Sequence, residues 1–143
     1  MKKRILPFIS VCFLVAALLN TGAFASVDAS KYILITNVTI VEKTGGLIEV
    51  DCTVTATGIY SDVGVEYIDF YEMGNSKPIA SYYFKDPGWS KLMGHGTSSH
   101  TVAVTYTCTP GVQYYADVGF YAGAYGVAGH GYSMTSAIAT ARK

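Results

Sequence analysis

The chain has 143 residues, ten Lys and Arg are balanced by ten Asp and Glu, and half of the residues are hydrophobic. This length suits one domain, and the scattered basic residues form no stripe that would favour nucleic acid. None of the few cysteines and histidines form pairs with the spacing of a zinc site, so we expect neither a metal nor a cofactor.

The N-terminus has the three parts of a secretory signal peptide, residues 1–25. It begins Met-Lys-Lys-Arg, continues with an apolar run over residues 5–19 and reaches a small-x-small motif at Ala23 and Ala25. The run is interrupted and shorter than the roughly 20 apolar residues of a membrane span. We therefore expect cleavage between Ala25 and Ser26, which leaves a secreted domain of residues 26–143 with no membrane span and a formal net charge of −3.

Apolar and polar residues alternate along the mature chain in segments bounded by turn residues, which is typical of half-buried strands. Leu47 to Thr57 shows this most clearly, with Val50, Cys52 and Val54 on the apolar face. Strands are predicted over residues 32–42, 47–57, 65–73, 79–85, 101–107, 113–122 and 132–141. This pattern predicts an all-β fold, a seven-stranded antiparallel Greek-key β-sandwich, with a small closed barrel as the alternative.

A short motif near the C-terminus consists of the turn Pro110-Gly111, then Tyr114, then an apolar strand over 116–122. In this motif, and in the glycine-rich loop after it, the chain resembles the C-terminal half of a fibronectin type III domain. The resemblance implies an immunoglobulin-like sandwich in which Tyr114 is the corner tyrosine, with its hydroxyl bonded back to the backbone. The short exported chain also resembles a group of uncharacterised small secreted proteins of Gram-positive bacteria.

Cys52 and Cys108 are the two cysteines of the mature chain, and they stand where the fibronectin family usually has tryptophan and leucine. In the sandwich that the resemblance implies, the second and fifth strands are neighbours, so the two inward sulfurs could meet in a disulfide. A secreted protein favours such a bond. The alternative is a pair of buried free thiols that pack as small hydrophobic side chains.

No group of residues predicts catalysis. His95 and His100 lie near Ser98 and Ser99, but the chain has no Gly-x-Ser-x-Gly motif, and neighbours in sequence do not make a catalytic triad. We therefore predict that the protein is not an enzyme, and we rank a hydrolase third among its functions.

Aromatic residues are the better indication of function, because twelve tyrosines and one tryptophan exceed the needs of a core of this size. Trp89 lies in a Pro-Gly turn and Tyr125 in the glycine-rich loop. Loops at the ends of sandwiches often bind partners, and Tyr and Trp dominate binding hot spots. We predict a secreted binding module that contacts an extracellular protein or a cell-surface glycan through these two residues. The alternatives are a structural role, with Trp89 as a lid over the sheet edge, and a secreted bacteriocin-like antagonist.

Overall fold

The computed structural model describes residues 31–143, apart from the side chains of Ala128 and His130. The strands are β1 (Ile33–Lys43), β2 (Leu47–Glu72), β3 (Ala80–Tyr83), β4 (Met93–Thr107), β5 (Gln113–Ala124), β6 (Ala128–Thr135) and β7 (Ala139–Thr140), and a short 3₁₀ helix, η2 (Ser90–Leu92), precedes β4. The predicted signal peptide and its cleavage site lie outside the described residues. No helix in the described part of the chain is long and apolar enough to cross a membrane.

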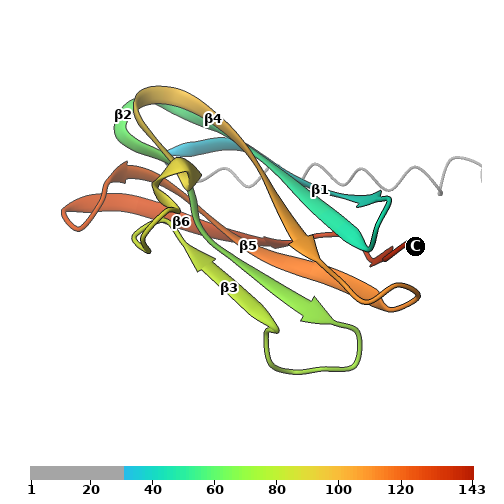
Figure 1. The fold of residues 1–143 in the computed structure, drawn as a ribbon. Helices are drawn as coiled ribbons and strands as arrows, with labels where there is room; N and C mark the ends of the chain where they lie inside the picture. Colours follow the sequence, from blue (N-terminus) through green and yellow to red (C-terminus); the bar gives the residue numbers. More distant parts are fainter. Residues whose placement is uncertain (1–30) are drawn as a thin grey trace, which may run out of the picture.

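The seven strands form one antiparallel sheet that curls strongly into a half-barrel (Figure 1). The main path runs β1-β2-β5-β6, while β3 and β4 also pair with β2, and β7 pairs with β5. The prediction of an all-β antiparallel fold of seven strands is therefore confirmed. The strands lie in a single continuous sheet, where the prediction had the two separate sheets of a sandwich.

The reason for this continuity is β2, which runs without interruption for 26 residues. Its first half pairs with β1 and β4, with the β4 ladder continuing as far as Gly64, and its second half pairs with β3 and β5. The sequence pattern predicts two separate strands here, 47–57 and 65–73. We call the two sides of the curl the β4 wall (β1, the first half of β2, and β4) and the β5 wall (β3, the second half of β2, β5 and β6).

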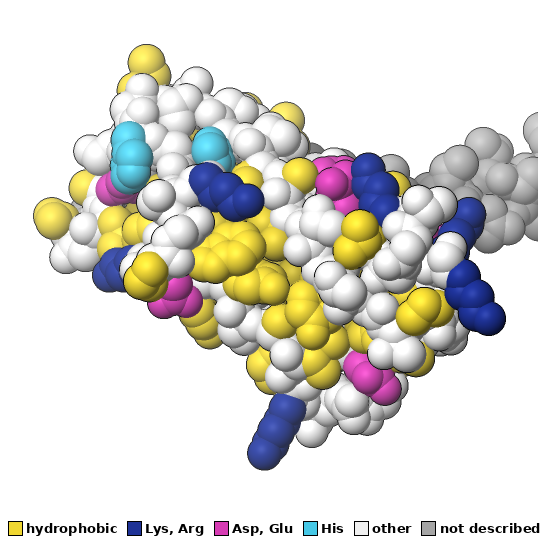
Figure 2. All heavy atoms as spheres, viewed as in Figure 1, with side chains coloured by type: hydrophobic (Ala, Val, Ile, Leu, Met, Phe, Trp, Pro, Cys, Tyr) yellow, Lys and Arg dark blue, Asp and Glu magenta, His cyan; other side chains and the backbone are white. Residues whose placement is uncertain are grey.

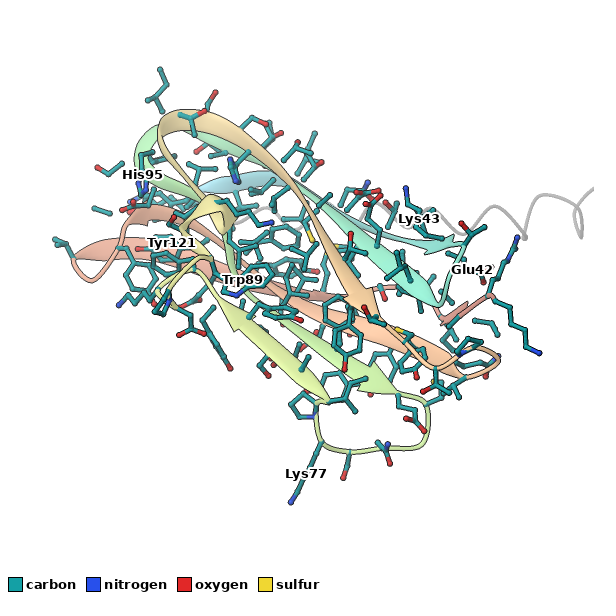
Figure 3. All side chains as sticks on the ribbon, viewed as in Figure 1. Glu42, Lys43, Lys77, Trp89, His95 and Tyr121 are labelled. Carbon is teal, nitrogen blue, oxygen red and sulfur yellow. The ribbon has the colours of Figure 1, made fainter. Side chains whose placement is uncertain are left out.

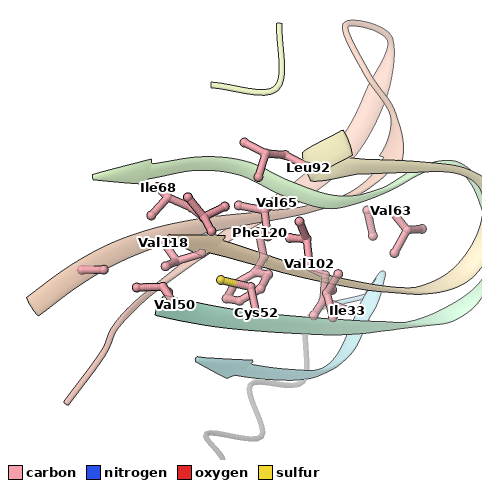
Figure 4. Close-up of a cluster of buried hydrophobic side chains, with 14 of the residues drawn as sticks. Ile33, Val50, Cys52, Val63, Val65, Ile68, Leu92, Val102, Val118 and Phe120 are labelled. Carbon is pink, nitrogen blue, oxygen red and sulfur yellow. The ribbon is translucent and has the colours of Figure 1, made fainter. Parts of the chain in front are cut away.

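The hydrophobic core fills the concave side between the two walls (Figure 4). Its largest fully buried side chains are Phe70, Phe120, Ile48, Ile68 and Leu92. Burial alternates along β5, where the even-numbered residues from Tyr114 to Ala122 point inward. The odd-numbered residues of β5 therefore form part of the outer face.

The prediction of a disulfide is wrong, because Cys52 and Cys108 are both free thiols. β2, which carries Cys52, and β4, which ends one residue before Cys108, are neighbours, as the resemblance implied, but the register keeps the sulfurs apart. Cys52 lies opposite Val102, whereas Thr107 lies opposite Leu47. Cys108 is thus about six positions from Cys52 along the pair of strands, roughly 20 Å at the rise of a β-strand. A disulfide needs Cα atoms within about 7 Å.

Tyr114 anchors the turn before β5. Its side chain is buried, and its hydroxyl accepts a hydrogen bond from the backbone N–H of Thr109 at 3.1 Å. This contact fixes the chain where it leaves β4 and enters β5, so it helps to hold the two walls in their relative positions.

Candidate functional site

The outer face of the β5 wall carries tyrosines and carboxylates in a regular arrangement. In the register between β2 and β5, Tyr71 lies opposite Tyr115, Asp69 opposite Asp117, and Tyr67 opposite Gly119. On the other side of β2, Tyr67 lies opposite Tyr83. We call this surface the tyrosine face and define it as Tyr67, Asp69, Tyr71, Tyr83, Tyr115, Asp117, Tyr121 and Ser133.

The rings of the tyrosine face pack against one another. Tyr71 and Tyr115 are stacked almost parallel, with centroids 5.0 Å apart and an interplanar angle of 6°. Tyr67 and Tyr83 lie 5.9 Å apart. Most of these rings are half-buried, and Tyr83 is 43% exposed. The outer surface of this wall is therefore largely aromatic.

Two glycines allow rings to lie flat on the sheet. A Cβ atom on Gly119 would collide with the ring of Tyr67, and one on Gly129 would collide with the ring of Tyr121. Glycine in a strand permits this kind of close approach by an aromatic side chain from the neighbouring strand. Tyr67 and Tyr121 are consequently held in place before any ligand arrives.

The carboxylates of the tyrosine face are poorly compensated. Asp69 and Asp117 face each other directly, an arrangement that destabilises a pair of strands. Thr135 donates a hydrogen bond to Asp117 Oδ1 at 3.3 Å, whereas Asp69 Oδ1 is buried and has no hydrogen-bond partner in the described part of the chain. None of the ion pairs formed within residues 31–143 involves either aspartate.

The tyrosines beside these carboxylates remain protonated at neutral pH. Burial, reinforced by the negative charges of Asp117 and Asp69, raises the pKa of Tyr67 above its ordinary value. Burial, followed by the negative charges of Asp69 and Asp117, also raises the pKa of Tyr71. The face thus offers neutral phenol rings and hydroxyls together with negative acceptors.

A hollow of about 230 Å³ opens in the tyrosine face beside Tyr67. It is lined by Glu66, Tyr67, Gly119, Phe120, Gly131, Tyr132 and Ser133. A second hollow, of about 470 Å³, lies between β1 and the end of β6 and is lined mainly by aliphatic and hydroxyl side chains. Only the first combines an aromatic ring with a carboxylate.

Tyr125, which the sequence suggested as a binding residue, is half-buried beside the tyrosine face. Its hydroxyl donates to Glu66 Oε1 at 2.6 Å, and its N–H donates to Asp62 Oδ2 at 3.0 Å. The ring packs edge-on against Phe84, and Lys85 Nζ lies 4.2 Å from its centroid. The hydrogen bond to the carboxylate, with burial, raises the pKa of Tyr125 to about 12. Tyr125 is therefore held by partners from β2 and the loop after β3, and it fixes the orientation of the Glu66 carboxylate.

Trp89, the other suggested binding residue, lies on a different surface. Figure 2 shows hydrophobic side chains gathered between β4 and β3, and Figure 3 places Trp89 in this region. Its ring packs on Tyr82 with centroids 4.0 Å apart, and it contacts the core cluster. Among the described residues it makes no ring contact with Tyr125. The structure does not unite the two residues in one site.

The histidines near the start of β4 are held by separate partners. His95 Nδ1 lies 2.8 Å from Asp62 Oδ1, and His100 Nε2 lies 2.9 Å from the carbonyl oxygen of Lys91. No group of three or more His, Cys, Asp or Glu side chains within the described residues is placed to hold a metal ion.

Comparisons with protein-family models, with curated proteins and with solved structures found no match to this chain. The class of protein is therefore given by its fold alone, an all-β antiparallel sheet curled into a half-barrel.

The sequence analysis missed the tyrosine face, although two patterns in the sequence belong to it. These are Tyr-x-Asp-x-Tyr at Tyr67 to Tyr71 and Tyr-x-Asp at Tyr115 to Asp117. Only the register shows that these two patterns lie side by side.

Proposed function

We propose that the protein is a secreted, non-catalytic binding module that holds a neutral glycan chain against its tyrosine face. The observation that carries this proposal is the set of tyrosine rings held on the outer face of the β5 wall beside carboxylates that lack cationic partners. Tyrosine rings on an outer face and carboxylates without cationic partners depart from good packing and charge pairing, and such departures are expected at functional sites.

The chemistry of the tyrosine face suits sugars. The electron-rich faces of aromatic rings pack well against polarised C–H groups, and sugar rings carry these on their apolar sides. Carboxylates accept hydrogen bonds strongly, and sugar hydroxyls supply donors in pairs. Lys and Arg are absent from the tyrosine face as defined, which disfavours phosphorylated or sulfated ligands.

As part of this proposal, we also propose that the domain is related in fold to fibronectin type III and immunoglobulin-like modules. The bond between the Tyr114 hydroxyl and the Thr109 N–H supports it, since such a bond is found at the tyrosine corner of those folds. Fold alone does not give function, so the glycan assignment depends on the tyrosine face and not on this resemblance.

Affinity gel electrophoresis of the mature protein in gels containing neutral glucans, mannans, galactans or xylans tests the proposal. At least one polysaccharide should retard the wild type, and Tyr71→Ala and Tyr115→Ala should each weaken the retardation at least tenfold. Tyr60→Ala is the matched control, because Tyr60 is not one of the residues that define the tyrosine face and packs instead on Tyr32, with ring centroids 5.4 Å apart. Equal retardation of all variants, or retardation by no polysaccharide, would refute the proposal.

A further inference from the structure

The hollow beside Tyr67 is created by an irregularity in β2. Val65 lies opposite Phe120 and Tyr67 lies opposite Gly119, so Glu66 is an extra residue with no partner on β5. Such a bulge redirects a side chain and is common next to binding sites. Here it brings the carboxylate of Glu66 and the ring of Tyr67 to the same hollow.

The carboxylate at this hollow is already oriented. The Tyr125 hydroxyl donates to Oε1 of Glu66 at 2.6 Å, and among the described residues no hydrogen bond is made to Oε2. Tyr67 and Ser133 also line the hollow, and their hydroxyl groups interact with each other. A ligand would therefore meet a fixed acceptor together with hydroxyl groups that already have a partner, which lowers the entropic cost of binding.

One of the residues that line the hollow, Gly131, has no side chain. A Cβ atom at this position would meet only the carbonyl oxygen of Phe120, at 3.6 Å, which is an ordinary contact. Gly131 is also not among the glycines with a left-handed backbone, so a larger residue is compatible with its conformation. The glycine is thus not required by the fold at this position, although it is required for the hollow to stay open.

From these features, and resting on the function proposed above, we infer that the hollow is the subsite for one hexose unit of the glycan. The sugar ring stacks on Tyr67, and two adjacent hydroxyls donate to the Glu66 carboxylate. The volume of about 230 Å³ is below the usual range for drug-sized ligands and suits a single ring. A sugar substituted at both of these hydroxyls would be rejected, because the carboxylate would then be buried without donors.

The decisive variant is Gly131→Val, which fills the hollow without forcing the backbone. Gly58→Val is its matched control, since Gly58 lies in a strand, β2, as Gly131 lies in β6, and neither has a left-handed backbone. A Cβ on Gly58 would come no closer than 3.9 Å to Tyr60. Glu66→Gln removes the charge while its amide oxygen can still accept the Tyr125 hydroxyl. Thermal unfolding of each variant establishes that it is folded before binding is measured.

Saturation-transfer NMR with methyl α-mannoside, methyl β-glucoside and methyl β-galactoside measures the subsite directly. At least one glycoside should show transfer from the wild type and from Gly58→Val, and none from Gly131→Val. Glu66→Gln should weaken binding of that glycoside at least fivefold. In the polysaccharide gels, Gly131→Val should weaken retardation about tenfold without abolishing it, because the rest of the tyrosine face is intact.

The outcomes separate this inference from the proposed function. If a polysaccharide retards the wild type and Gly131→Val and Glu66→Gln behave identically to it, the hexose subsite is refuted while the glycan-binding function stands. If no neutral polysaccharide binds, both fail. If only polylysine binds, the tyrosine face recognises a cationic protein segment, and both are again overturned.

Discussion

Iodoacetamide added at pH 8 to the native protein, prepared as residues 26–143, should leave Cys52 and Cys108 unmodified. Burial raises the pKa of Cys52 to about 12 and that of Cys108 to about 11. At pH 8 about one Cys52 side chain in ten thousand is a thiolate, compared with about a quarter of ordinary exposed cysteines. Cys52 is also fully inaccessible and Cys108 is 8% exposed, so reagent access slows the reaction further. The rate at which iodoacetamide modifies Cys52 in the native protein should therefore be at least a thousandfold lower than the rate for an exposed cysteine.

Intact-mass spectrometry is the assay, with and without denaturant and always without reductant. The native protein should gain no adduct over an hour, and the denatured protein should gain two. Cys52→Ala should gain only one in denaturant and should lose about 1 kcal/mol of stability, as is common for a small change in a core. Two results would refute the reasoning. A denatured chain that reacts only after reduction contains a disulfide, and rapid modification of the native chain means that Cys52 is not in the core.

Three further predictions concern the stability of the fold. Phe70→Ala should lower the free energy of unfolding by about 3–5 kcal/mol in urea titrations, because Phe70 is fully buried and stacks on Tyr106 at 5.1 Å, and a loss below 1 kcal/mol would contradict this packing. Tyr114→Phe should cost about 0.5–1.5 kcal/mol by the same measurement, since the bond from the Thr109 N–H is lost, and an unchanged midpoint would show that this bond contributes nothing. The raised pKa of Tyr125, about 12 against about 10 for an unfolded chain, contributes stability that is complete below pH 10 and is lost as pH rises through 12. The stability of Tyr125→Phe should therefore fall less steeply than that of the wild type between pH 10 and 12, and parallel curves would show that the hydroxyl ionises normally.

The candidate site was only partly predictable. The abundance of tyrosine predicted an aromatic surface, but the loop positions of Trp89 and Tyr125 gave no indication that the tyrosines of β2 and β5 lie side by side. Tyr125 is half-buried, with its hydroxyl and its N–H bonded to Glu66 and Asp62, and Trp89 packs on Tyr82. These partners are distant in sequence, so no local pattern could reveal them.

The sequence by itself determined that the described chain is built of antiparallel strands with alternating inner and outer faces. Alternation with a period of two is written locally, in segments such as Leu47 to Thr57 and Gln113 to Ala122, because each strand buries one face whatever it pairs with. Only the tertiary structure decided which strands pair and in what register. That choice made β2 a single strand shared by both walls, kept Cys52 and Cys108 apart, and placed the tyrosines of β2 and β5 side by side. Register depends on the packing of the whole core and on where bulges interrupt the ladder, and neither is encoded within one strand.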